Sequence, residues 1–99
     1  MNYEVKNNEE RSRFEIKLDN GEFAHQDYRY FQNDLAIMHT YVPDGYEGKG
    51  LAEKLTLFAF DFAKKNKYPL MVYCPYVLAY LKKHPEYQYL VDKDPLHQS

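Results

Sequence analysis

The stretch YVPDGYEGKGLAEKL, residues 41–55, joins a segment with strand character to one with helix character through three glycines and a proline. Beyond Gly50 apolar residues recur at helical spacing, and cationic residues gather near Asn66, where the helix dipole favours them. Before Tyr41 the chain reads as a strand, in which alternate side chains point to opposite faces. The stretch therefore predicts a strand, a glycine-rich loop and a helix over residues 50–66.

Short alternating segments ahead of the loop predict three or four antiparallel strands. Asn20-Gly21 is a strong hairpin signal between the second and third, and Asn33 with Asp34 turns the chain before the fourth. The predicted strands cover residues 3–6, 13–18, 23–31 and 35–42.

The fourth segment is expected to alternate regularly, which places His39 on the same face as Leu35, Ile37 and Tyr41, and Thr40 on the opposite face. After the long helix, residues 69–74 read as a buried strand. Pro75 then occupies a good first helical position, and residues 76–84 continue as a short helix ended by Pro85. The polar tail after Leu90 is expected to fray. This order predicts an α+β, or mixed α/β, sheet covered by helices.

Composition limits the function classes. A chain of 99 residues forms one domain, over residues 1–99. Its formal net charge of −2 argues against nonspecific nucleic-acid binding, and no apolar run approaches the roughly 20 residues that cross a bilayer. The single cysteine excludes an internal disulfide, the four histidines lack metal-ligand spacing, and the first residues do not resemble a signal peptide. We expect a cytoplasmic protein without a metal, either a monomer or a weak homodimer.

The glycine-rich loop has the composition of an anion site. The first N–H groups of a helix lack internal partners and carry partial positive charge, which favours phosphate. Gly45, Gly48 and Gly50 allow the backbone to approach such a ligand. Lys49 adds a positive charge there and Glu47 subtracts one. The alternative is a flexible loop without a ligand, and the common nucleotide-binding motifs are absent.

The segment GYEGKG, residues 45–50, resembles the acetyl-CoA signature of the GNAT acetyltransferase superfamily, Gln/Arg-x-x-Gly-x-Gly/Ala, with Gly45 at the first position. Together with HTYVP, GKGLAEKL, CPYV and YLKKHPEY, it resembles the short, single-domain GNAT-like branch called the yjdJ type, over about residues 13–91. Members of that branch generally have Arg where this chain has Glu47. The resemblance implies an N-acetyltransferase with acetyl-CoA as co-substrate. It also implies that backbone groups bind the cofactor: those of Gly48, Lys49, Gly50, Leu51 and Ala52 its pyrophosphate, and those of Tyr41 and Val42 its pantetheine arm.

Cys74 ends a predicted strand directly before Pro75, so its sulfur is expected at a helix N-terminus, where the dipole favours thiolate. A buried, inert cysteine is the alternative; the resemblance implies a position near the acetyl end of CoA. Strands joined by a crossover helix are parallel, so His39 could face the same cleft and act as a general base. A half-buried histidine bonded to a carbonyl is equally compatible.

Two residues of the last helix complete the predicted site. By region alone, the resemblance implies that Tyr80 protonates the departing CoA thiolate; packing with Tyr76 is the alternative. Lys83, with its neighbours Lys82 and His84, could meet the remaining CoA phosphate or form a solvated helix end.

Three functions therefore compete. The first is an acyltransferase that transfers acetyl to an unidentified acceptor, an amine by the resemblance, either directly or through acetylated Cys74. The second is a CoA-binding module without efficient catalysis. The third is a reader of RNA or peptide that uses Tyr28 and Tyr30 on one strand face, against which the negative charge argues.

Overall fold

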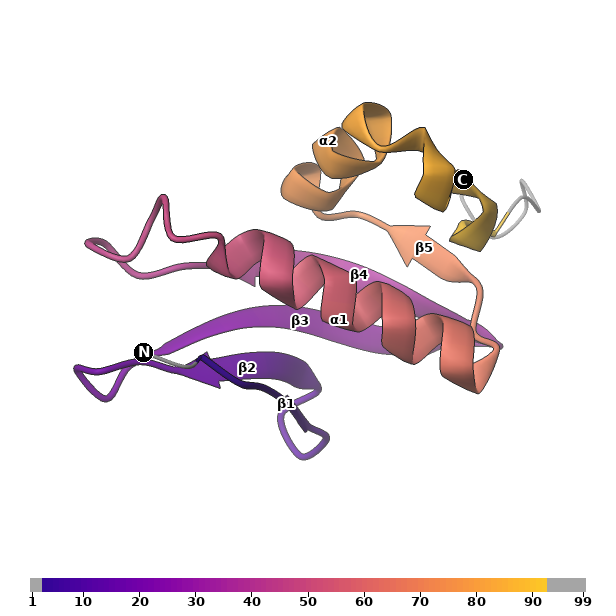
Figure 1. Cartoon of the computed structure of the whole chain (residues 1–99). Helices are drawn as coiled ribbons and strands as arrows, with labels where there is room; N and C mark the ends of the chain where they lie inside the picture. The colour runs from indigo at the N-terminus through magenta and orange to yellow at the C-terminus, as the bar shows by residue number, and fades with distance from the viewer. Residues whose placement is uncertain (1–2, 93–99) are drawn as a thin grey trace.

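The computed structural model describes residues 3–92 and shows one sheet covered by helices (Figure 1). The strand order is β1-β2-β3-β4-β5. Helix α1 lies along the sheet, with α2 and the 3-10 helix η1 beside it (Figure 1). The predicted mixed α+β fold is confirmed. The elements are β1 Val5–Asn8, β2 Arg13–Lys17, β3 Phe23–Phe31, β4 Asp34–Tyr41, α1 Leu51–Asn66, β5 Leu70–Val72, α2 Pro75–Lys83 and η1 Pro85–Leu90.

The first four strands are antiparallel as predicted, and β4 and β5 are parallel across the α1 crossover. Strand β1 lies two residues later than the predicted segment 3–6. Asn7 can occupy a strand because its Oδ1 accepts a 2.7 Å hydrogen bond from the Tyr28 hydroxyl, a long-range contact that local patterning does not reveal. The turn before β4 is Gln32 and Asn33, because Asp34 already pairs with Phe31.

Strand β4 contains a bulge at Met38. Its neighbours Ile37 and His39 pair with Tyr28 and Asp27, which are consecutive in β3, so Met38 has no opposite residue there. The extra residue reverses the alternation. Ile37 is buried, His39 is exposed, and Thr40 lies on the face that α1 covers. The expectation that His39 shares a face with Ile37 is therefore wrong.

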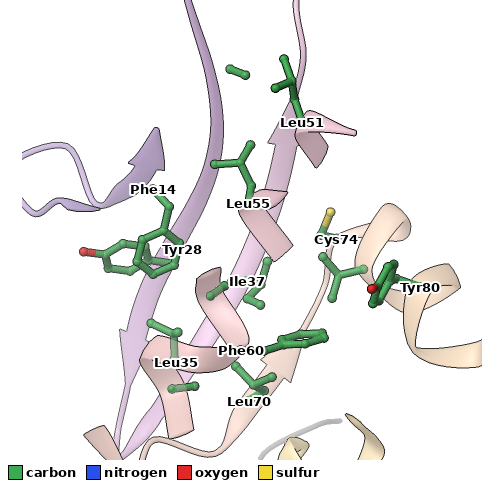
Figure 2. Close-up of a cluster of buried hydrophobic side chains, with 14 of the residues drawn as sticks. Phe14, Tyr28, Leu35, Ile37, Leu51, Leu55, Phe60, Leu70, Cys74 and Tyr80 are labelled. Atoms are coloured by element: carbon green, nitrogen blue, oxygen red, sulfur yellow. The ribbon is translucent and has the colours of Figure 1, made fainter. Parts of the chain in front are cut away.

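The core lies between α1 and the sheet (Figure 2). Leu55 and Ala59 of α1 are fully buried, and the rings of Phe14 and Tyr28 lie 4.6 Å apart beneath the helix. Tyr28 is only 2% exposed, so it is not available to stack a base. This removes one of the two tyrosines on which the hypothesis of an RNA reader depends. The buried apolar residues of α1 are Leu51, Leu55, Ala59, Phe60 and Ala63.

The C-terminal part departs from the prediction in the length of β5 and in the residues after Leu90, and it contains η1, which was not predicted. Strand β5 has three residues rather than six, because the chain turns into α2. Val91 forms a parallel bridge with Leu70, and the N–H of Asp92 donates to the Leu70 carbonyl at 2.8 Å, so the expected fraying does not hold for these two residues. The rest of the predicted tail, 93–99, lies outside the described residues. No helix within residues 3–92 is long and apolar enough to cross a membrane.

We predict that Leu55→Ala lowers the free energy of unfolding by about 2–5 kcal/mol, because it leaves a cavity at a fully buried position. Leu57→Ala, on the same helix but 37% exposed, is expected to cost about 1 kcal/mol or less. Urea denaturation of both variants measures the difference. Equal losses would contradict the described position of α1 on the sheet.

Candidate functional site

The glycine-rich loop ends directly at the first turn of α1. Gly48 and Gly50 have φ of 80° and 76°, and Gly50 is the N-cap of the helix. These angles lie in the left-handed region, which glycine reaches without a steric penalty. The N–H of Lys54 donates to the Gly50 carbonyl, so the N–H groups of Leu51, Ala52 and Glu53 precede the first helical hydrogen bond. The loop thus presents backbone donors at a helix N-terminus.

A pocket of about 280 Å³ lies against this loop. It lies where the end of β4, the loop, the first turn of α1 and the start of α2 meet. Its lining includes five of the eight predicted cofactor-binding residues; Tyr41, Lys49 and Lys83 do not line it. The lining residues are Val42, Tyr46, Glu47, Gly48, Gly50, Leu51, Ala52, Glu53 and Tyr76.

The three other predicted cofactor-binding residues lie elsewhere. Lys49 is exposed in the loop. Tyr41 is 46% exposed, and its ring lies 5.4 Å from that of His25, its partner in β3. Lys83 is in the last turn of α2, about 10 Å along the helix axis from Tyr76 by helical rise. Tyr41 and Lys49 are sequence neighbours of pocket residues, whereas Lys83 is not.

The side chains of the pocket carry negative charge. Glu47 and Glu53 both line it, and among the described lining residues none is Lys or Arg. Glu47 bends back so that its Oε1 accepts a hydrogen bond from the Gly45 N–H at 3.2 Å. Any attraction for an anion here therefore comes from the backbone amides and the nearby Lys49.

Strands β4 and β5 separate next to the pocket. The N–H groups of Tyr73 and Cys74 both donate to the Ile37 carbonyl, at 2.9 and 3.1 Å, and the chain then enters α2. Beyond Ile37, β4 pairs with β3, and no described strand pairs with it on the β5 side. This leaves a strand edge, residues 38–41, that leads to the pocket at Val42.

Cys74 is the N-cap of α2, as predicted, and is 1% exposed. Its sulfur lies 3.1 Å from Thr40 Oγ1 (Figure 2 shows the sulfur at the edge of the core, near the start of α2). His39 lies on the opposite face of β4, so the two groups that the structure brings together are Cys74 and Thr40 rather than Cys74 and His39. Sequence reasoning missed Thr40 because the alternation gave no sign of the bulge.

Two tyrosines of α2 lie near the pocket. The Tyr80 hydroxyl donates to Glu53 Oε2 at 2.9 Å, and the Tyr80 ring stacks on His84. Burial, followed by the hydrogen bond to Glu53, raises the pKa of Tyr80 to about 12, so this phenol keeps its proton at neutral pH. Tyr76 was missed as a site residue although it lines the pocket; its place directly after Cys-Pro at the helix start was the available signal.

Comparison with known proteins bears on the family and the fold. A family model described as GCN5-related N-acetyl-transferase matches residues 13–90. The chain is 33% identical to Protein NATD1 of Gallus gallus over 93% of this chain and 86% of that protein, and 33% identical to Protein NATD1 of Mus musculus over 92% and 84%. The NMR solution structure of a GCN5-like protein from Staphylococcus aureus superposes with a TM-score of 0.71 and 28% identity, over 90% of this chain and 87% of that one.

The chain belongs to the GCN5-related N-acetyltransferase family. The predicted resemblance of the chain to this family is therefore confirmed. Its fold is that of a GNAT-like protein, and its general role is that of an acetyltransferase domain.

The contact between Tyr80 and Glu53 predicts a specific loss of stability in alkali. The folded-state pKa of Tyr80, about 12, lies above the ordinary tyrosine value of 10.0, so the folded protein holds this proton more tightly than the unfolded chain. The stability advantage of the neutral phenol is thus complete below about pH 10 and lost as the pH rises through about 12. Wild type is expected to exceed Tyr80→Phe in free energy of unfolding at pH 8, and the difference to shrink or reverse by about pH 11.

Denaturant unfolding at both pH values measures this effect, with Tyr89→Phe, a change at a residue 60% exposed, as the control. A difference between wild type and Tyr80→Phe that is independent of pH would contradict the prediction.

Proposed function

We propose that this protein binds acetyl-CoA and transfers the acetyl group to an amine. The observation that carries the proposal is the pocket at the start of α1, where Gly48 and Gly50 with positive φ expose a run of helix N-terminal amides. The N–H groups of residues 48–52 would hold the CoA diphosphate, with the Lys49 ammonium beside them. These residues suit a diphosphate because its negative charge would be met by backbone N–H groups that lack hydrogen-bond partners within the helix.

The strand edge past Ile37 is the proposed support for the pantetheine arm. The backbone of Tyr41 and Val42 would align the arm along β4, and Val42 lines the pocket where the arm would leave the diphosphate. Bound in this way, the thioester would lie in the gap between β4 and α2, near Thr40 and Cys74. Lys83, at the far end of α2, is the proposed contact for the remaining phosphate.

Direct transfer and transfer through Cys74 both break the C–S bond to CoA. In direct transfer the amine nitrogen attacks the thioester carbonyl carbon, a C–N bond forms, and the C–S bond to CoA breaks. The amine loses one proton and the departing CoA thiolate takes up one. Tyr80 stays the proposed proton donor, and Tyr76 offers a second phenol at the pocket itself. His39 is proposed only as a base toward an acceptor, because it faces away from Thr40.

Burial of Cys74 favours a second candidate, a CoA-binding module without efficient turnover. The sulfur is 1% exposed and does not line the pocket, so a bound thioester would reach it only after a local rearrangement. The oligomeric state and the cytoplasmic location stay predictions from the sequence.

We predict that Glu47→Gln binds CoA about threefold more tightly than wild type at low salt, because it removes a negative charge from the pocket wall. Isothermal titration measures the change, which should shrink as salt screens the interaction. Glu10→Gln makes the same charge change in the exposed turn between β1 and β2 and is expected to leave the affinity unchanged. No binding of CoA to wild type at millimolar concentration would overturn the proposed function.

Incubation with acetyl-CoA separates the enzyme from the module. The enzyme is expected to release free CoA in the presence of an acceptor amine, and the route through Cys74 to add one acetyl group at that residue. Intact mass and peptide mapping would locate the adduct, and Cys74→Ala is expected to lose it. Release of CoA that persists in Cys74→Ala would favour direct transfer. Tight binding with neither release nor adduct would favour the module.

A further inference from the structure

A chain of buried polar side chains connects the sheet, α1 and the sulfur of Cys74. Gln26 of β3 and Thr56 of α1 are both 0% exposed. Gln26 Nε2 lies 3.0 Å from Thr40 Oγ1 and 3.1 Å from Thr56 Oγ1, and Thr40 Oγ1 lies 3.1 Å from Cys74 Sγ. These four side chains, from β3, β4, α1 and the N-cap of α2, form a single hydrogen-bonded chain.

The direction of these hydrogen bonds is fixed at the α1 end. The Thr56 hydroxyl donates its only hydrogen to the Ala52 carbonyl at 2.8 Å, so toward Gln26 it can only accept. The Gln26 atom between the two threonines must therefore be the amide nitrogen, which donates to both. An amide nitrogen cannot accept, so the Thr40 hydroxyl hydrogen cannot be directed at Gln26.

Among the side-chain hydrogen bonds of the described residues, the other partner of Thr40 Oγ1 is the sulfur. With one lone pair of Thr40 Oγ1 occupied by Gln26, its O–H is free to donate to Cys74 Sγ, 3.1 Å away. A hydroxyl that donates to sulfur stabilises the thiolate more than the thiol, because hydrogen bonds to a charged acceptor are the stronger ones.

Two irregular features of the fold support the contact between Thr40 and Cys74. The bulge at Met38 turns Thr40 toward Cys74; without it, Thr40 would face away. The orientation of the Gln26 amide leaves its buried Oε1 without a hydrogen-bond partner among the described residues. An unmade buried hydrogen bond is destabilising, so such a group in a native protein needs an explanation, and a catalytic role is one of them.

We propose that Gln26 and Thr40 are positioning residues that hold a hydroxyl hydrogen on the Cys74 sulfur and so keep it a hydrogen-bond acceptor, ready to take an acetyl group. The catalytic part rests on the proposed function. In that step the Cys74 thiolate attacks the thioester carbonyl carbon, a new C–S bond to Cys74 forms and the C–S bond to CoA breaks. CoA leaves as a thiolate and takes up the proton that the Cys74 thiol has released, so the exchange of one thioester for another is balanced.

The first test needs no CoA. The protein has one cysteine, so material labelled with ¹³C at the cysteine β carbon gives one NMR signal, whose chemical shift distinguishes thiol from thiolate. Thr40→Val keeps the shape but removes the hydroxyl, and Thr40→Ser restores the hydroxyl. The midpoint of the thiol-to-thiolate transition is expected to rise by about one pH unit in Thr40→Val, and to stay near wild type in Thr40→Ser. The ionisable groups near this end of α2, Tyr76, Tyr80 and Glu53, are the same in all three proteins.

A second, uncharged variant tests the role of Gln26. In Gln26→Met nothing donates to Thr40 Oγ1 from this position, so the Cys74 thiol can donate to that oxygen, and the midpoint is expected to rise toward the value in Thr40→Val. Thermal unfolding identifies the variants that fold, and either one alone tests the proposal. A midpoint in folded Thr40→Val equal to that of wild type would overturn it.

The effect on acetyl transfer to Cys74 is measured separately. With acetyl-CoA, the rate of adduct formation on Cys74 is expected to fall about tenfold in Thr40→Val and to recover in Thr40→Ser, while the dissociation constant for CoA stays within about twofold of wild type. A midpoint that shifts as expected in a protein that does not bind CoA would support the hydrogen-bond assignment and reject the proposed function. An adduct that forms equally fast in Thr40→Val would reject the positioning role and leave the proposed function intact.

Discussion

The carbonyl of Ile37 accepts two backbone hydrogen bonds, from the N–H groups of Tyr73 and Cys74, and this junction ends the pairing of β4 with β5. Because the two strands separate there, β4 keeps a free edge toward α2 while β3 supports its other side. The same junction sets Cys74 at the start of α2. The positions of the pocket and of the Cys74 sulfur, and the open edge of β4, thus all follow from this junction in the sheet.

Helix α1 combines a structural and a chemical role because its two faces differ. Its apolar face, with Leu55 and Ala59 fully buried, packs on the sheet and supplies much of the core. Its N-terminal turn supplies backbone donors to the pocket. Glu53 in that turn accepts a hydrogen bond from the hydroxyl of Tyr80 in α2. The packing of α1 on the sheet therefore forms much of the core and also sets the position of the backbone amides at the pocket.

Much of the fold could be predicted from the sequence, because local signals and tertiary contacts agree over α1, the hairpins and α2. The glycine loop and the place of Cys74 at a helix start were also predictable, since positive φ and a proline at the first helical position are local requirements. The contact of Thr40 with Cys74 was not, because the bulge at Met38 depends on pairing with β3 and has no local signature. Tyr76 and Gln26 belong to the same group: their roles depend on neighbours distant in the sequence.

The bridge between Val91 and Leu70 has a consequence for association. A strand at the border of a sheet offers unpaired backbone groups that can recruit another chain. In this molecule β5 is the border strand on one side, and Val91 and Asp92 cover part of it with their own backbone. On the opposite border β1 is only four residues long, with Glu4 before it and exposed Lys6 within it. Within the described residues, both borders of the sheet are thus partly protected against edge-to-edge pairing with another chain.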